Sequence, residues 1–342
     1  MSERLEDIAL AMVAEGQGIL AADESTGTIQ KRFDSIGVEN TEENRRDYRE
    51  MLFRAEEAMG DYVSGVILFQ QTLHQKAADG TPFVDLIRAA GAVPGIKVDK
   101  GAQPLAGGTD EKVTEGLDGL RDRLKDYHAA GARFAKWRGV IEIDGGPRPT
   151  YGAIKANAHA LARYAALCQE AGIVPIVEPE VLMDGKPGDH PIERCHAVTA
   201  QVLHIVFDEL HDANVLLEGM VLKPNMVVPG QHSTPASVEE VATHTVDVLK
   251  RHVPSAVPGI AFLSGGQSDT DATAHLAAMN AMYDLPWKLT FSYGRALQAA
   301  ALQAWGGKPD NVAAAQKAFA HRARMNGLAA RGEWKEALED AA

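Results

Sequence analysis

Lysine and carboxylate side chains directly follow short apolar runs at several points along the chain. Asp23 follows GILAA, Lys97 follows GI, and Lys223 follows GMVL. Two acids, Glu178 and Glu180, stand at the end of IVPIVEPE. A single lysine in such a place is usually a solvated surface group. Several lysines and acids at the ends of successive strands would point toward one mouth, which favours a site for an anionic substrate.

Lysine beside carboxylate indicates amine chemistry. A lysine amine attacks a ketone only when it is neutral, so its pKa must fall from about 10.4. Burial and a neighbouring cation both lower such a pKa. Lys223 and Lys136, the lysine of FAKWRGVIEI, are both candidates for the nucleophile, and the pattern does not choose between them. A carboxylate such as Glu178 would move protons during carbinolamine dehydration.

Two glycine-containing loops indicate phosphate binding. LSGGQS contains Ser264 and Gly265 and leads into a helical stretch, and SYGRALQ brings Gly294 and Arg295 to the start of another. Glycine lets backbone N–H groups approach an anion, and a helix N-terminus adds partial positive charge. A lone glycine pair is usually a turn. These two loops follow the last two apolar runs, where phosphate sites recur in barrels.

The apolar runs alternate with stretches of helical periodicity. Candidate strands begin about 30 to 45 residues apart, the spacing expected of βα units, and candidate helices cover residues 41–59, 116–131, 153–172 and 237–253. Eight units predict an α/β fold, a (β/α)8 TIM barrel. The alternative is a doubly wound sheet, but no G-x-G-x-x-G follows the first strand. We expect residues 1–342 to form one domain, with a short C-terminal tail from about residue 331.

Charge and composition exclude several partners. The formal net charge is −13, and no basic stripe offsets it, which argues against nucleic-acid binding. No apolar run approaches the roughly 20 residues of a membrane helix, and the opening MSERLEDIALAM lacks the apolar core of a signal peptide. Cys168 and Cys195 are expected to be free thiols in a reducing compartment. These features predict a cytoplasmic protein without nucleic-acid or membrane partners.

Nine motifs of the sequence also resemble one known family. They are GILAADESTGTI, ENTEENRRDYRE, GIKVDKG, FAKWRGV, IVPIVEPE, LEGMVLKPNM, FLSGGQS, FSYGRALQ and AWGGK. In this order they resemble class I fructose-bisphosphate aldolase, and the likeness runs from about residue 5 to residue 330. It implies a (β/α)8 barrel that cleaves fructose 1,6-bisphosphate through a lysine Schiff base, in glycolysis and gluconeogenesis. No cofactor is implied, because an iminium would replace the metal ion as electron sink.

The resemblance implies catalytic roles for particular residues. Lys223 would form the Schiff base, and Lys136 would depress its pKa. Glu178, with Glu180 beside it, would protonate and remove the carbinolamine hydroxyl. Asp23 would orient the substrate and act on its C4 hydroxyl as the C3–C4 bond breaks, giving dihydroxyacetone phosphate and glyceraldehyde 3-phosphate.

The resemblance also implies which groups bind the substrate. Lys136 and Arg138 would hold hydroxyl and phosphate groups, with Lys97 close to the same carboxylates. The groups around the phosphate on the ketone side would be Ser264, Gly265, Gly294 and Arg295. The groups toward the other phosphate would be Ser25, Thr28, Lys31 and Arg32.

One feature departs from the family pattern. Many relatives end in a tyrosine that aids proton transfer to the enamine, whereas this sequence ends GEWKEALEDAA and its last tyrosine is Tyr293. The resemblance also implies a homotetramer, which the sequence does not itself show.

Two rival interpretations are disfavoured. A metal-dependent aldolase or a transaldolase-like barrel is one, but no histidine stands at a strand end with metal-ligand spacing, so no metal site is expected. The other is a catalytically inactive barrel that serves only as a scaffold. Such a protein would be free to lose Lys223, Glu178 or Asp23, whereas all three are present.

Overall fold

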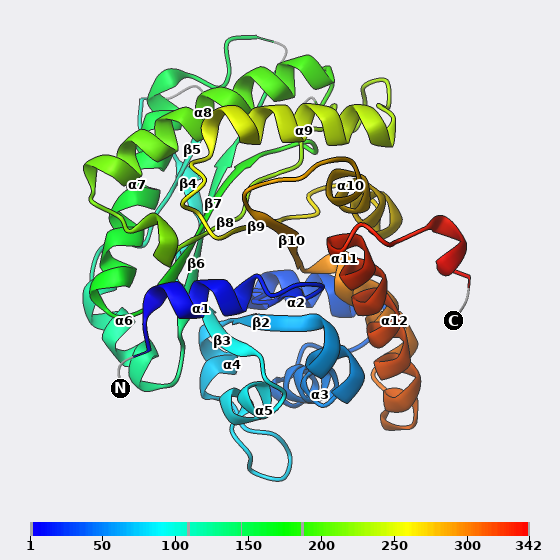
Figure 1. Cartoon of the computed structure of the whole chain (residues 1–342). Coiled ribbons are helices and arrows are strands. Elements are labelled where there is room, and N and C mark those ends of the chain that lie inside the picture. Colours follow the sequence, from blue (N-terminus) through cyan, green and yellow to red (C-terminus); the bar gives the residue numbers. More distant parts are fainter. Residues whose placement is uncertain (1–2, 108–109, 145, 186–187, 341–342) are drawn as a thin grey trace.

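The computed structural model describes residues 3–107, 110–144, 146–185 and 188–340. A closed barrel of parallel strands lies at its centre and helices surround it (Figure 1). The strands run in the order β1-β10-β9-β8-β7-β6-β3-β2, so the predicted (β/α)8 barrel is confirmed. Their bounds are β1 Gly18–Ala22, β2 Val63–Leu68, β3 Val93–Lys97, β6 Phe134–Ile141, β7 Val174–Val181, β8 Val221–Leu222, β9 Gly259–Phe262 and β10 Lys288–Tyr293.

Helices precede, connect and follow the strands of the barrel. They are α1 Leu5–Met12, α2 Thr26–Asp34, α3 Glu42–Phe53, α4 Gln70–His74, α5 Phe83–Ala89, α6 Leu120–Ala129, α7 Tyr151–Glu170, α8 Ile192–Asp212, α9 Val238–His252, α10 Asp269–Met282, α11 Arg295–Trp305 and α12 Val312–Ala330. A two-stranded antiparallel sheet, β4 Ala102–Pro104 and β5 Lys112–Thr114, lies between β3 and α6. Short helical turns cover Ala58–Tyr62, Leu217–Gly219, Pro309–Asn311 and Glu336–Leu338.

Three of the four expected helices are confirmed, as α6, α7 and α9. The fourth, 41–59, is divided: α3 ends at Phe53, and the Ala55 amide donates to the carbonyl oxygen of Leu52 at 3.1 Å. Such an i to i−3 bond tightens a helix end, and periodicity alone does not reveal it.

Side chains inside the barrel change from apolar to charged along several of the strands. Because strand side chains alternate between faces, residues two apart share a face. Ile19 and Ala21 of β1 belong to the interior cluster, and Asp23 continues their series. Val174 and Ile176 lead in the same way to Glu178 on β7. The alternation that builds the core therefore also aims the charged residues at the C-terminal mouth.

Helix α1 closes the other end of the barrel. Its Ile8, Ala9 and Met12 pack with interior strand residues such as Phe134, and the helix crosses the strands in Figure 1. Space inside is tight: a Cβ at Gly95 would lie 2.3 Å from the Phe134 ring. The interior is thus a packed core, as expected for a barrel of this size.

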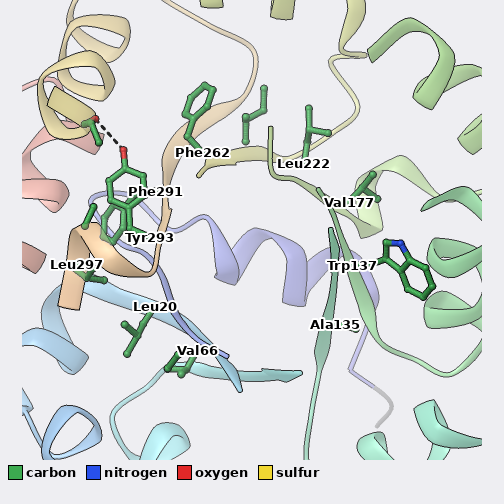
Figure 2. Close-up of a cluster of buried hydrophobic side chains, with 14 of the residues drawn as sticks. Leu20, Val66, Ala135, Trp137, Val177, Leu222, Phe262, Phe291, Tyr293 and Leu297 are labelled. Atoms are coloured by element: carbon green, nitrogen blue, oxygen red, sulfur yellow. Dashed lines mark hydrogen bonds between the residues drawn. The ribbon is translucent and has the colours of Figure 1, made fainter. Parts of the chain in front are cut away.

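A second apolar layer joins the outer faces of the strands to the helices. Leu20, Ala135, Trp137 and Val177 belong to this layer and point away from the barrel interior (Figure 2). The phenol of Tyr293 lies in it as well and donates to the carbonyl of Ala272 on α10 at 3.0 Å. This layer fixes each strand against its helix and so fixes the positions of the strand ends.

Cys168 and Cys195 are free and buried, in α7 and α8. Within the described ranges, no helix has the length and hydrophobicity to cross a bilayer.

Gly95→Ala should destabilise the barrel, because its methyl group would overlap the Phe134 ring. Overpacking of this kind costs about 1–3 kcal/mol. We expect a lower urea midpoint for this variant than for Gly60→Ala, a control whose Cβ would meet no atom within 4 Å. Equal midpoints for the two variants would contradict this account of the interior.

Candidate active site

A cavity of about 770 Å³ opens at the C-terminal mouth of the barrel. Almost all residues predicted for the site line it. They are Asp23, Ser25, Thr28, Arg32, Lys97, Lys136, Arg138, Glu178, Glu180, Lys223, Ser264, Gly265, Gly294 and Arg295. Lys31 is the exception, since it is exposed on α2 and does not belong to the lining. Strands, loops and helix termini thus bring distant segments together.

Four charged groups form a chain across the cavity floor. The Nζ of Lys223 lies 3.3 Å from Oε1 of Glu178. The other oxygen of Glu178, Oε2, lies 3.5 Å from Nζ of Lys136, and Lys136 donates to Oδ2 of Asp23 at 2.8 Å. All four residues are buried. Because their strands are neighbours or meet across the barrel, β1, β6, β7 and β8 each supply one member.

The two lysines of this chain differ in their electrostatics. Burial lowers the pKa of Lys223, and the positive charge of Lys136 lowers it further against the opposing pull of Glu178. Burial also acts to lower the pKa of Lys136, but Asp23, Glu178 and Asp99 outweigh it and raise that pKa. Lys136 therefore stays charged, while Lys223 is shifted toward the neutral amine that attacks carbonyls.

Asp23 remains a carboxylate in spite of its burial. Burial acts to raise its pKa, but the charges of Lys136, Lys223 and Lys97 lower it to about 2. Glu178 keeps one buried oxygen, Oε2, without a hydrogen-bond donor among the described residues. One carboxylate is thus a fixed anion, while the other has an oxygen available to exchange a proton beside Lys223.

Two further cations are held by carboxylates. The Nζ of Lys97 donates to Oδ1 of Asp99 at 2.6 Å and to the Asp99 carbonyl oxygen at 3.0 Å. Arg138 pairs with Glu180 through Nε and Oε2. Glu180 lies on β7 two residues beyond Glu178, so both acids face the cavity. The structure therefore separates their partners: Glu178 contacts lysines and Glu180 contacts an arginine.

The two glycine-containing loops lie at the start of α10 and just before α11. Gly265 has a φ of +55°, a left-handed conformation that favours glycine. Ser268 caps α10 by accepting from the Asp271 amide at 3.0 Å. Arg295 at the start of α11 binds Asp269 at 3.2 Å and also the carbonyl of Gln267. This contact ties the two loops together.

Helix α2 brings a third helix terminus to the cavity. Ser25 caps it, accepting from the Thr28 amide at 3.4 Å, and the hydroxyls of Ser25 and Thr28 lie 3.1 Å apart. Arg32 pairs with Glu24. A Cβ built on Gly294 would lie 3.4 Å from Nη2 of Arg32, so this arginine adjoins the loop before α11.

Some lining residues lie outside the predicted set. Asp99 and Lys100 stand with Lys97 at the end of β3, so their strand-end position in the sequence does indicate them. Glu24 directly follows Asp23, which offered a similar signal. Arg123 reaches the cavity from α6, and no sequence pattern separates it from an ordinary helix-surface arginine. No cluster of three or more His, Cys, Asp or Glu side chains suited to a metal ion occurs among the described residues.

Comparison with known proteins gives one consistent result. The family model described as "Fructose-bisphosphate aldolase class-I" matches residues 4–342. A probable fructose-bisphosphate aldolase class 1 of Xanthomonas campestris pv. campestris is 57% identical over 335 residues, which cover 97% of this chain and 99% of that protein. A cytosolic fructose-bisphosphate aldolase of Arabidopsis thaliana is 57% identical over 94% of this chain and 88% of its own length.

A solved structure shows the same architecture. The fructose-bisphosphate aldolase of Plasmodium falciparum superposes with a TM-score of 0.94 at 50% identity, covering 97% of this chain and 95% of that one. Match length, identity and shape therefore agree with a barrel whose mouth carries a buried lysine with a lowered pKa. The chain belongs to the class I fructose-bisphosphate aldolase family.

Proposed function

We propose that Lys223 is the amine that forms the Schiff base in the cleavage of fructose 1,6-bisphosphate. The opposite pKa shifts of the two buried lysines carry this assignment, because only Lys223 is shifted toward the neutral form. The neutral amine attacks the C2 ketone and forms a carbinolamine. Lys136 then serves as the permanent cation that disfavours a second charge on Lys223.

Glu178 is the proposed proton carrier for carbinolamine dehydration. Its Oε1 is 3.3 Å from the nitrogen that becomes the iminium. Its Oε2 has no hydrogen-bond donor and so is free to hold the proton that the departing hydroxyl takes as water. Lys136, 3.5 Å from Oε2, balances the charge of the carboxylate after the proton leaves.

Asp23 is the proposed base for carbon–carbon cleavage. With a pKa of about 2 it is ionised at neutral pH and can accept the C4 hydroxyl proton. As the C4 carbonyl forms, the C3–C4 bond breaks and its electron pair moves into the iminium as an enamine. Glyceraldehyde 3-phosphate leaves; protonation of C3 and hydrolysis of the imine then release dihydroxyacetone phosphate.

Tyr293 cannot supply the proton for that last step from its present position. It is fully buried, and its hydroxyl donates to the Ala272 carbonyl away from the cavity. Glu178 is the acid closest to the enamine nitrogen. After giving its first proton to the departing hydroxyl, it takes up another from solvent water and is the proposed donor to C3.

The remaining lining residues are proposed to bind the two phosphates and the hydroxyls. Backbone N–H groups and helix termini attract phosphate oxygens, and arginine binds them in pairs of hydrogen bonds. The ketone-side phosphate is assigned to Ser264, Gly265, Gly294 and Arg295. Groups toward the other phosphate are Ser25, Thr28 and Arg32, with exposed Lys31 nearby, while Lys97, Lys136 and Arg138 bind along the sugar chain.

Assembly and location are also proposals. Residues 1–342 are proposed to act as a single domain whose short C-terminal segment from about residue 331 packs on the barrel helices. Residues 341–342 lie outside the described part of the chain. The Arabidopsis relative named as cytosolic supports a cytoplasmic location. A homotetramer is proposed from family likeness, and multi-angle light scattering would test it.

Borohydride should trap dihydroxyacetone phosphate on Lys223. Incubation with both reagents in EDTA should give a peptide carrying the reduced adduct at this residue, and cleavage activity should survive EDTA. Lys223→Met should lose the adduct and activity, while Lys317→Met, an exposed control on α12, should retain both. An adduct on Lys136 would overturn the assignment, and activity abolished by EDTA would overturn the mechanism.

Lys136→Met should move the reactivity of Lys223 to higher pH. Removing the neighbouring positive charge raises the pKa of Lys223, so less neutral amine exists at pH 7 and more appears only as pH rises. Each unit of pKa change gives about a tenfold difference in neutral amine. We expect trapping to slow at least about tenfold at pH 7 and to recover partly near pH 9. An unchanged pH profile would remove Lys136 from this role.

A further inference from the structure

Five of the cations that line the cavity are already paired with a carboxylate. The pairs are Lys97–Asp99, Lys136–Asp23, Arg138–Glu180, Arg295–Asp269 and Arg32–Glu24. An incoming phosphate must therefore compete with a carboxylate for its cation. A carboxylate that loses its partner in a buried place is strongly destabilised.

Glu24 differs from the other cavity carboxylates in having two arginine partners. Its Oε1 pairs with Arg32, and its Oε2 pairs with Arg49 of α3. Gln298 adds a hydrogen bond to Oε1 at 3.1 Å. Among the described residues, no other carboxylate lining the cavity is bound by two arginines.

The two arginines occupy different environments. The Arg49 side chain is only 4% exposed and does not line the cavity, whereas the Arg32 side chain is 20% exposed and does. Arg32 also adjoins Gly294, at the loop assigned to phosphate. Arg32 can therefore meet substrate, and Arg49 cannot.

Burying the Arg49 guanidinium is unfavourable in free energy, and the need to fill space in the core does not explain why an arginine stands here. Within the described part of the chain, its Nε and Nη1 have no hydrogen-bond partner, and Glu24 is the one carboxylate that it contacts. The Tyr48 ring lies 5.4 Å from its Cζ and offsets part of the charge. Burying a guanidinium with two unpaired nitrogens is unfavourable, and a methionine of similar length would fill the same space.

We infer that Arg49 is a positioning residue, a permanent counterion for Glu24 that allows Arg32 to leave that carboxylate and bind a substrate phosphate. When Arg32 turns to the phosphate, Glu24 keeps a full positive charge beside Oε2. Without Arg49, the departure of Arg32 would leave the buried carboxylate of Glu24 without a counterion. The inference rests on the proposed role of Arg32 in binding phosphate. It adds the group that compensates the charge of Glu24 when Arg32 moves to the phosphate.

Inorganic phosphate is a suitable probe, because it reports on this site without the chemical steps. Its dissociation constant would be measured by calorimetry for the full chain and for R32M, R49M, E24Q and E24Q/R49M. Steady-state KM and kcat for fructose 1,6-bisphosphate would be measured alongside. Circular dichroism and thermal unfolding would verify that each variant folds.

The expected result is a background-dependent effect of R49M. Alone, it should weaken phosphate binding about tenfold, since Glu24 then retains Arg32; KM should rise while kcat changes by less than about threefold. In the E24Q background the same substitution should change the dissociation constant for phosphate by less than about twofold, because residue 24 then carries no charge that needs a counterion. R49K, which keeps the charge, should bind phosphate nearly as the unaltered chain does.

Three outcomes would overturn the inference. R49M could leave phosphate affinity unchanged, or it could weaken binding equally with and without the charge of Glu24, which would mean that Arg49 attracts phosphate directly. Unchanged affinity in R32M would remove the role of Arg32 itself. Borohydride trapping on Lys223 remains an independent test of the proposed mechanism in each case. Should R49M fail to fold, R49Q removes the charge while keeping polarity and takes its place in the same comparison.

Discussion

The reactive centre depends on confining two lysines and two carboxylates within one small, water-poor volume. Lys223, Glu178, Lys136 and Asp23 are linked by contacts of 3.3, 3.5 and 2.8 Å. Burial makes a charge on Lys223 unfavourable, while Asp23 keeps Lys136 charged. The same low-dielectric surroundings thus shift the pKa values of the two lysines in opposite directions, as the proposed roles of nucleophile and permanent cation require. Neither lysine would acquire its role on an exposed surface.

The barrel supplies this confinement through strand alternation. Interior positions are filled by apolar side chains near α1 and by charged side chains near the mouth. The apolar interior side chains near α1 exclude water from that end of the barrel. The outer layer of Trp137, Val177 and their neighbours holds the strands in register (Figure 2). Rigid strand ends are suited to chemistry that requires atoms to be fixed within fractions of an ångström.

The proposed phosphate binding uses a different part of the same architecture. Helices α2 and α11 begin at the mouth with Ser25 and Arg295 in the cavity lining, and the loop before α10 contributes Ser264 and Gly265. The net charge of −13 is compatible with an anionic substrate because cations gather locally in the lining, and several of them are paired with carboxylates. Carboxylate partners limit repulsion among these cations before substrate arrives. The inferred part played by Arg49 extends this arrangement one layer beyond the cavity wall.

Much of the architecture could be predicted from periodicity. Apolar runs and helical stretches predicted all barrel strands, and the family motifs named fourteen residues that line the cavity. Lys31 and Arg32 show the limit of such prediction. They are adjacent in sequence, yet a helix points neighbouring side chains in different directions, so Arg32 reaches the cavity and Lys31 faces solvent.

The sequence by itself determined the order of strands and helices, the glycine positions of the phosphate loops, and the set of charged residues at strand ends. Tertiary structure alone decided which carboxylate faces which cation, and therefore which of Lys223 and Lys136 carries the lowered pKa. It also decided that Arg49, to which no motif assigned a role, pairs with Glu24. The reason is that burial and charge–charge distance are properties of packing, and they depend on residues more than a hundred positions apart, such as Asp23 and Lys136.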